Sequence, residues 1–145
     1  MTLVRYRDFT CAILIDTLGR FLLQQRDNVS DIVRPGKIGL FGGHREEGET
    51  YLQCIVREVH EELSYYLAPE RFEYVGNYDA TDIDPEGSTV IHGEFFVARG
   101  VPVERVVVTE GTLFIAELGE LPALEYRLSP SGKAGLQAVL EQKQR

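Results

Sequence analysis

The stretch from residue 43 to residue 65, GHREEGETYLQCIVREVHEELSY, constrains the fold of this chain more than any other. A glycine turn opens it, and the residues that follow have the periodicity of one amphipathic helix. At about 100° per residue, Glu58, Glu61 and Glu62 share one face of that helix. An apolar stripe lies roughly 115° around the helix from Glu58 and comprises Leu52, Ile55, Val56, Val59 and Leu63. The sequence therefore predicts a helix with one carboxylate face and one core face.

Three ionised carboxylates on neighbouring turns repel one another, by roughly a few tenths of a kcal/mol per pair even when they are exposed. A cation offsets that repulsion, and Arg57 in the same helix supplies one positive charge. Oxygen ligands gathered on a rigid element also suit Mg²⁺ or Mn²⁺. Three glutamates alone are more often a solvated helix face. The glycine turn and Arg57 shift the balance toward a metal site.

The segment resembles the Nudix box, G-x5-E-x7-R-E-U-x-E-E-x-G-U, in which U is an apolar residue. Seven positions of the chain are in register with it, namely Gly43, Glu49, Arg57, Glu58, Val59, Glu61 and Glu62. Ser64 stands where the family has glycine, and Tyr65 stands where it usually has an aliphatic residue. Because glycine there ends a helix in the left-handed conformation, we expect an altered or slightly strained helix exit and unaltered chemistry.

The resemblance implies a hydrolase that cleaves the diphosphate linkage of a nucleoside diphosphate joined to another group, with Mg²⁺ or Mn²⁺ as cofactor. Carried over by position, Glu58 and Glu62 are the expected direct metal ligands. Glu61 is expected to be a ligand directly or through water. The backbone carbonyl of Gly42 is a further expected ligand.

Glu49 and Arg57 match a pair that joins the turn to the helix by a salt bridge in the family. A bidentate contact between them would fix the catalytic loop and offset part of the local negative charge. The alternative for Glu49 is an ordinary glutamate of the first helical turn, favoured by the helix dipole.

A carboxylate outside the box is also expected, because family members often place one, as base or metal ligand, in a loop beyond the central strands. Glu110 follows the β-branched run 103–108 and is the first candidate. Glu94 and Asp79 are the next candidates. Most loop glutamates are simply solvated, which is the alternative for each of them.

Basic residues that flank the predicted site are candidate phosphate contacts. They are Arg26, Arg34 and Lys37, each of which singly is more often part of a solvated surface. His44 follows the glycine turn and is a candidate substrate contact. His60 and His92 show no ligand spacing, so we expect neutral structural residues.

Short apolar runs bounded by turn residues predict strands at residues 10–15, 21–25, 38–41, 72–78, 90–99, 103–108 and 113–116. Ser129 and Pro130 predict the start of a final helix that runs to about residue 142. Strands with one helix after the third and another at the end predict a sheet covered on both faces. The family resemblance implies the same α/β fold, an α/β/α sandwich around a mixed β-sheet in a single domain over residues 1–145.

Residues 79–89 are expected to form an acidic loop that imitates the first half of an EF-hand. Gly93 stands at the position of the bidentate glutamate of such a loop, and both flanks have strand patterns, so a calcium site is not expected. Cys11 and Cys54 lack CxxC or Cys/His spacing and are expected to be buried free thiols.

The net charge of −8, without a Lys/Arg cluster, argues against a surface for duplex nucleic acid or for an anionic membrane. The sequence shows no signal-peptide pattern and no apolar stretch of about 18 residues, so we expect a cytoplasmic protein. A homodimer is compatible with the sequence.

Substrate identity stays open at this point. The proline that marks family members for ADP-ribose and the tyrosine that marks those for dinucleoside polyphosphates are both absent around residues 80–82. Nucleoside triphosphates and nucleotide sugars are equally open. A catalytically silent nucleotide-binding module is the alternative function. It is compatible with Ser64 and with Phe41, which replaces a proline that the family commonly has before the glycines. The dense acidic face argues against it, because a binder needs no such face, and an isomerase-type relative would alter the box.

Overall fold

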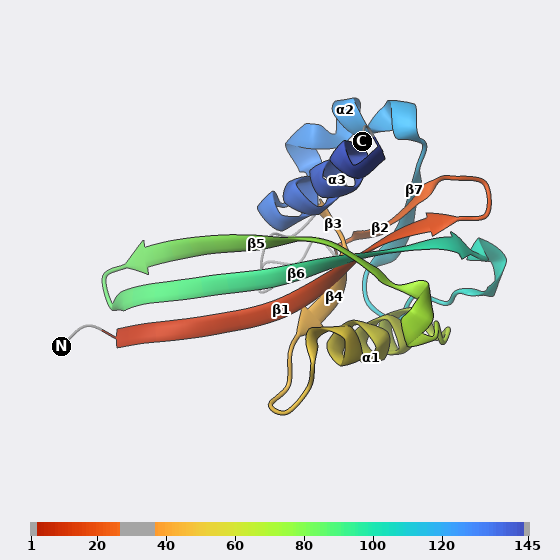
Figure 1. The fold of residues 1–145 in the computed structure, drawn as a ribbon. Helices are drawn as coiled ribbons and strands as arrows, with labels where there is room; N and C mark the ends of the chain where they lie inside the picture. The colour runs from red at the N-terminus through yellow and green to blue at the C-terminus, as the bar shows by residue number, and fades with distance from the viewer. Residues whose placement is uncertain (1–2, 27–36, 144–145) are drawn as a thin grey trace.

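The computed structural model describes residues 3–26 and 37–143, in which seven strands form one mixed sheet with helices on both faces (Figure 1). The strands are β1 (Leu3–Asp16), β2 (Phe21–Gln25), β3 (Ile38–Gly39), β4 (Phe41–His44), β5 (Glu73–Asp84), β6 (Gly87–Val101) and β7 (Thr112–Ala116). The main order is β3-β2-β1-β6-β5, while β4 pairs with β1 and β7 pairs with β2. The pairing of β1 with β6 is parallel and the other pairings are antiparallel, which makes the sheet mixed.

Helix α1 (Tyr51–Leu63) covers one face of the sheet, and α3 (Pro130–Lys143) covers the other, together with the short helix α2 (Leu121–Leu124). Single 3₁₀ turns occur at Pro69–Arg71, Val103–Arg105, Leu118–Glu120 and Glu125–Arg127. Strand β1 serves both cores because successive side chains of a strand point to opposite faces. Its Ala12 and Leu14 pack on the α1 side, and its Ile13 and Ile15 pack on the α3 side. The predicted α/β/α sandwich is confirmed.

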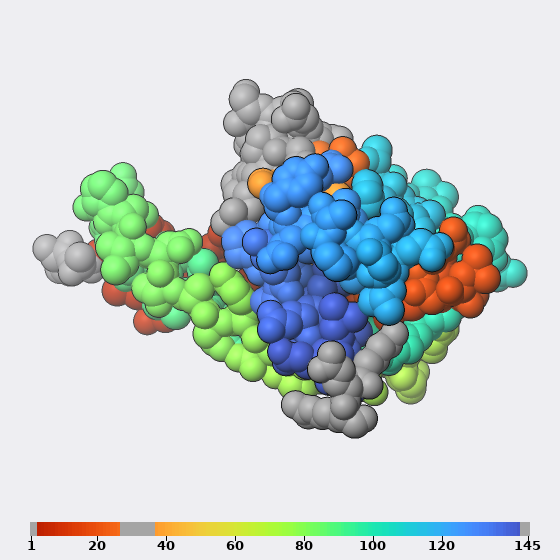
Figure 2. Space-filling model, turned by 90° about the horizontal axis from the view of Figure 1, so that it is seen from above, coloured from red at the N-terminus to blue at the C-terminus, as the bar shows by residue number. Residues whose placement is uncertain are grey.

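Strands β1, β5 and β6 continue past the helices as a three-stranded arm (Figures 1 and 2). The expectation of an acidic loop over residues 79–89 is wrong, because β5 and β6 stay paired as far as Asp84 and Gly87. Only two residues form the turn, where Asp84 Oδ1 accepts the backbone N–H groups of Glu86 and Gly87 at 2.9 and 3.0 Å. Much of the arm is exposed on both faces, so its sequence lacks the alternation of a half-buried strand. The hairpin also confirms that this segment is no EF-hand loop.

The predicted strand over residues 103–108 is also wrong. The segment begins with a 3₁₀ turn and then runs across the end of α1, where the N–H groups of Val107 and Thr109 donate to the carbonyls of Leu63 and Glu62 at 2.8 and 2.9 Å. The last carbonyls of a helix have no partner within the helix. The N–H groups of this segment therefore bond to those carbonyls and not to a neighbouring strand. Val103, Val106 and Val108 pack against the α1-side core, which explains why the segment resembles a buried strand in the sequence.

The predicted strand over residues 38–41 is divided in two by the structure. Residues Ile38–Gly39 pair with β2, and Phe41–His44 pair with β1, so the chain changes its partner strand at Leu40.

Among the described residues, no helix combines the length and apolar character needed to cross a bilayer.

Both ends of α1 have defined caps. Thr50 accepts the backbone N–H of Gln53 at 3.0 Å, and the Gln53 side chain accepts the N–H of Thr50 at 2.9 Å, which forms a capping box. At the other end Ser64 has φ 52° and ψ 32°, in the left-handed region. Of the two expected outcomes, an altered exit or a strained one, the structure therefore has the strained one.

Replacing Ser64 by glycine should stabilise the protein by about 1 kcal/mol, because a non-glycine residue pays roughly that amount in the left-handed region. Thermal unfolding should show a melting temperature several degrees higher, with Ser64→Ala as the control that keeps the strain. A lower melting temperature for the glycine variant would mean that the serine hydroxyl or its restricted backbone matters more than the strain.

Candidate active site

The carboxylate face of α1 borders a cleft of about 930 Å³ between that helix, the glycines of β4 and the sheet. Its acidic lining residues are Glu46, Glu58, Glu61, Glu62, Asp82 and Glu110, and its basic ones are Arg7, Arg26 and Arg45. Apolar side chains of Phe9, Leu40, Tyr78 and Ile91 and the residues 129–131 before and within α3 complete much of the wall. The cleft is therefore strongly acidic on one side and partly basic and apolar elsewhere.

Two glycines of β4 allow close approaches, Gly42 to the neighbouring strand β1 and Gly43 to the Glu58 side chain of α1. A Cβ atom on Gly42, which has φ 152°, would lie 2.0 Å from the carbonyl oxygen of Thr10. A Cβ atom on Gly43 would lie 2.4 Å from the carboxyl carbon of Glu58. A side chain at residue 42 would collide with the backbone of β1, and one at residue 43 would displace the Glu58 carboxylate from the β4 backbone.

Glu62 is the most buried of the three helix glutamates, with a relative exposure of 6%. One of its oxygens accepts the N–H of Gly42 at 2.8 Å, and the other lies 3.5 Å from Gln24 Nε2. Burial, with a further contribution from the charges of Glu58 and Glu110, raises the pKa of Glu62 to about 8, although the Gly42 N–H opposes the shift. An ionised Glu62 at neutral pH therefore needs a cation nearby.

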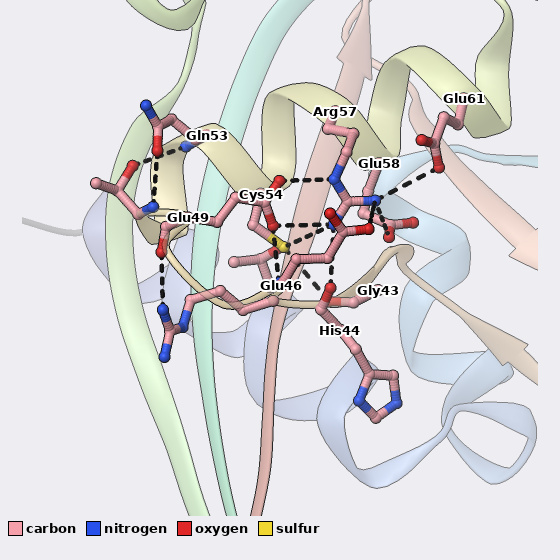
Figure 3. A network of polar contacts seen from close by, with 12 residues as sticks. Gly43, His44, Glu46, Glu49, Gln53, Cys54, Arg57, Glu58 and Glu61 are labelled. Atoms are coloured by element: carbon pink, nitrogen blue, oxygen red, sulfur yellow. Dashed lines mark hydrogen bonds and ion pairs between the residues drawn. The ribbon is translucent and has the colours of Figure 1, made fainter.

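Arg57 lies at the centre of the contacts on this helix face (Figure 3). Its Nε and Nη2 donate to the two oxygens of Glu49 at 2.6 and 3.0 Å, and this contact is the main cause that lowers the pKa of Glu49 to about 2. Its Nη1 donates to Glu58 at 2.8 Å and lies 3.5 Å from Glu61. Nη2 also donates to the carbonyl of His44 at 3.1 Å. The expected ion pair between Glu49 and Arg57 is present and bidentate.

The donor set suits a hard divalent cation, since it consists of carboxylate oxygens around one buried carboxylate that is costly to ionise alone. Within residues 3–26 and 37–143, no three carboxylate, imidazole or thiol groups are gathered tightly enough to form a complete ligand set. Arg57 accounts for this, because Glu58 is paired with it, while Glu61 is 60% exposed and turned toward solvent. A cation at this face would compete with Arg57 for Glu58.

Of the other predicted residues, Glu110, Arg26 and His44 line the cleft. Glu110 is exposed, and its backbone carbonyl accepts a hydrogen bond from Gln24 Nε2 at 3.0 Å, which places residue 110 near Glu62. Lys37 is not among the described lining residues, and its ammonium group donates to the carbonyl of Tyr126 at 2.9 Å. Arg34 lies outside the described residues.

Glu94 and Asp79 lie away from the cleft lining and both contact His92. The Nδ1 of His92 lies 2.6 Å from Asp79 and its Nε2 lies 2.7 Å from Glu94. The hydrogen bond to Asp79, followed by that to Glu94, raises the pKa of His92 above its ordinary value and so favours the imidazolium. His60 makes an edge contact with Tyr66, in keeping with a structural role.

Both cysteines are buried and free, as expected. Burial is the main cause that raises the pKa of Cys11 to about 12 and that of Cys54 to about 11, so neither is a reactive thiolate at neutral pH.

Arg7 and Gln24 are lining residues that the sequence did not indicate. Arg7 Nη2 lies 3.3 Å from His44 Nε2, and no carboxylate lies within ion-pair distance of Arg7 in the described part of the chain. A signal was available, because Arg7, Phe9 and Cys11 alternate along β1 and all line the cleft. It was missed because the expected strand began at residue 10.

The NUDIX domain family model matches residues 5–126 of the chain. A search of curated proteins gives no match. The fold is similar to that of a MutT protein from Methanosarcina mazei Go1, with a TM-score of 0.74 and 21% identity over 99% of each chain. The E. coli dihydroneopterin triphosphate pyrophosphohydrolase is similar with a TM-score of 0.69 and 21% identity over 94% of this chain and 96% of that one.

A further similar structure is a bifunctional NMN adenylyltransferase/ADP ribose pyrophosphatase from Francisella tularensis, solved with AMP and a manganese ion. Its TM-score is 0.73, with 21% identity over 98% of this chain and 43% of that one. At these identities the solved structures establish a shared fold, and the family match carries the assignment of the chain.

Proposed function

From the premise that this chain belongs to the Nudix family of hydrolases, which act on diphosphate bonds, we propose a divalent-metal-dependent pyrophosphohydrolase of nucleoside diphosphate derivatives. The observation that carries the proposal is the burial of Glu62 beside Glu58, in a cleft that also receives Glu110. A binding module without catalysis would gain nothing from this costly arrangement of carboxylates.

The residues that would hold Mg²⁺ or Mn²⁺ are Glu58, Glu61 and Glu62, with the backbone carbonyl of Gly42. The bound ion would neutralise charge that develops on phosphoryl oxygens and would lower the pKa of a bound water. Glu62 is held for this role by the N–H of Gly42, which fixes one of its oxygens at 2.8 Å. Its burial limits the contact of its carboxylate with water.

Other residues of the chain would position the substrate and the site. The bidentate contact between Arg57 and Glu49 ties the turn after β4 to the middle of α1. Arg26 and His44 are proposed to contact phosphate groups, because both line the cleft. Arg7 joins them as a cationic neighbour of His44. Lys37 is left out, since its ammonium group is already bonded to Tyr126.

We also propose that residues 1–145 form one Nudix hydrolase domain, beyond the matched range. The support is α3, which follows residue 126 and packs Leu136 and Val139 into the core of the sheet. Residues 129–131, at its start, line the cleft. The last helix is therefore part of the catalytic unit.

Replacing Glu110 by glutamine should lower kcat about a hundredfold, the lower end of what a positioned general base contributes. A carboxylate at this place in the cleft can orient or deprotonate the attacking water. The melting temperature should change little, because the side chain is exposed. Glu94→Gln is the matched control, and a larger kcat loss for that variant would move the role to Glu94 on β6.

The proposed function is tested by a hydrolysis screen with Mg²⁺ over nucleoside triphosphates, nucleotide sugars and dinucleotides, with phosphate products separated by chromatography. Cleavage between two phosphoryl groups of at least one compound is expected. Tight binding of nucleotides without cleavage of any compound would favour the silent binding module instead.

A further inference from the structure

Asp8 is the centre of a polar cluster beside the cleft, where β1 leaves the body of the protein for the arm. Asp8 and Tyr51 are not among the described lining residues of the cleft, whereas Arg45 is one of them. The Oδ2 of Asp8 accepts a hydrogen bond from Arg45 Nε at 2.6 Å, and its Oδ1 accepts one from the Tyr51 hydroxyl at 2.6 Å. Its backbone carbonyl also accepts the N–H of Arg45 at 2.8 Å. One residue of the sheet thus holds both the start of the turn after β4 and the first residue of α1.

Arg45 passes this constraint on to Glu49. Its Nη1 donates to the backbone carbonyl of Glu49 at 2.8 Å, while its guanidinium lies 5.1 Å from the centroid of the Tyr51 ring. The carboxylate of Glu49 is in turn bonded to Arg57, which donates to Glu58. A continuous series of contacts therefore runs from Asp8 to a carboxylate of the cleft.

Within itself, the turn over residues 45–50 is closed mainly by Glu49. The N–H of Glu46 donates to the Glu49 carboxylate at 2.9 Å, and the N–H of Glu49 donates to the Glu46 carbonyl at 3.1 Å. In the part of the chain that the structure describes, the polar contacts between the sheet and this turn are those that join Asp8 to Arg45. The position of the turn on the sheet therefore depends on Asp8.

The cluster favours an ionised Asp8. Burial alone would raise its pKa, but the hydrogen bonds from Tyr51 and Arg45 outweigh burial and leave the pKa below its usual value. The charge of His92, whose ring meets the edge of Tyr51 at a centroid distance of 5.6 Å, acts in the same direction. An asparagine at this position would have the same shape, but it could not accept from both donors with full charge.

We propose that Asp8 is a positioning residue for the hydrolysis, which acts through Arg45 and Tyr51 to fix residues 45–50 so that Glu49 holds Arg57 against Glu58. This role rests on the proposed function, because it supports the reaction proposed there. Asp8 itself touches neither substrate nor metal.

The test compares Asp8→Asn with wild type in the full chain, by steady-state kinetics on a substrate from the screen and by Mn²⁺ binding measured with electron paramagnetic resonance. We expect kcat to fall about tenfold, as for other residues that orient metal ligands, with KM nearly unchanged and Mn²⁺ bound more weakly. Arg5→Gln is the matched control. Arg5 lies on β1, as Asp8 does, and its replacement removes an ion pair with Asp84 of β5 without changing a contact of the turn. It should match wild type in all three quantities.

Two further variants keep the test decisive. Tyr51→Phe removes only the hydroxyl that bonds Asp8, so it should fold and show a kcat loss of a few fold even if Asp8→Asn unfolds. The double variant Asp8→Asn with Arg45→Gln should be no slower than the slower single variant, because both changes break one series of contacts.

The proposal is overturned if Asp8→Asn or Tyr51→Phe matches Arg5→Gln in kcat and Mn²⁺ affinity, or if the two losses of the double variant multiply. If wild type hydrolyses none of the tested compounds while binding nucleotides, the proposed function fails instead. The two failures are therefore distinguishable.

Discussion

Chelation of divalent ions should abolish hydrolysis of every accepted substrate, with a loss of at least about a thousandfold, and Mg²⁺ or Mn²⁺ should restore it. The physical reason is the charge of the cleft. Glu58, Glu61, Glu62 and Glu110 all line it, so an anionic phosphate chain would meet net repulsion without an ion to bridge the two.

The measurement is product formation in EDTA, followed by titration with each ion. Circular dichroism in EDTA is the control, because an unfolded protein would also be inactive. Full activity in the chelator, with the protein folded, would refute metal dependence.

The Glu62→Gln variant should lose two to three orders of magnitude in kcat, because the substitution removes the charge of the most buried proposed ligand. The matched control is Glu61→Gln, which removes a charge from the same helix face at a position that is 60% exposed. We expect the Glu61 variant to lose less. A rate near that of wild type for Glu62→Gln would mean that the wrong carboxylate face has been assigned.

The same variant should be more stable than wild type in the absence of metal. The pKa of Glu62 rises from 4.5 to about 8 on folding, so between these pH values the folded state holds a proton that the unfolded state has released. This group therefore lowers the free energy of unfolding as pH increases from about 4.5 to about 8. Glutamine does not titrate, so residue 62 of the variant does not lower the free energy of unfolding over this pH range.

Urea unfolding without metal should show Glu62→Gln more stable at pH 8 by on the order of 2 kcal/mol, and the advantage should disappear near pH 4.5. The Glu61 variant is the matched control, because it removes a charge from an exposed position of the same helix face. Equal stability of Glu62→Gln and wild type at pH 8 would show that Glu62 is solvated well enough to ionise without a cation. At residue 62, glutamine is thus expected to lower activity and to raise stability, whereas glutamate does the reverse.

The helix at the centre of the site could be predicted because its signals are local. The spacing of the glutamates and of the apolar stripe defines α1, and Ile55, Val59 and Leu63 are fully buried as that stripe requires. Ser64 in place of the family glycine predicted an altered or a strained helix exit, and the structure has the strained, left-handed one. In both cases the spacing of the residues along the chain is enough to predict the local structure.

The arm and the segment after β6 could not be predicted because their structure depends on distant partners. Val106 and Val108 look like a strand in sequence, yet the backbone of this segment bonds to the end of α1. The acidic residues of β5 look like a loop, yet β6 pairs with them for the length of the arm. Tertiary pairing overrides local propensity in both cases.

The same limit applies within the candidate site. The box predicted which carboxylates share a face, but the burial of Glu62 follows from its contacts with Gly42 and Gln24 on the sheet. Asp8 escaped notice altogether, because its side chain meets Arg45 and Tyr51 at separations of 37 and 43 residues. Motif spacing identifies the candidate carboxylates, whereas the residues that hold them are visible only in the folded chain.

The parallel pairing of β1 with β6 has a consequence for the order in which this protein folds. Arg5 and Thr89, which pair across these strands and are bonded through their side chains, lie 84 residues apart in the chain. Closing so long a loop lowers the entropy of the chain before the contacts that offset this loss have formed, which slows the search for the native topology. On the ribosome, β1 has to wait for β6 while β4 and α1 are already made. Helix α1 and the glycines of β4 are therefore synthesised well before β1, the strand with which β4 pairs, can pair with β6.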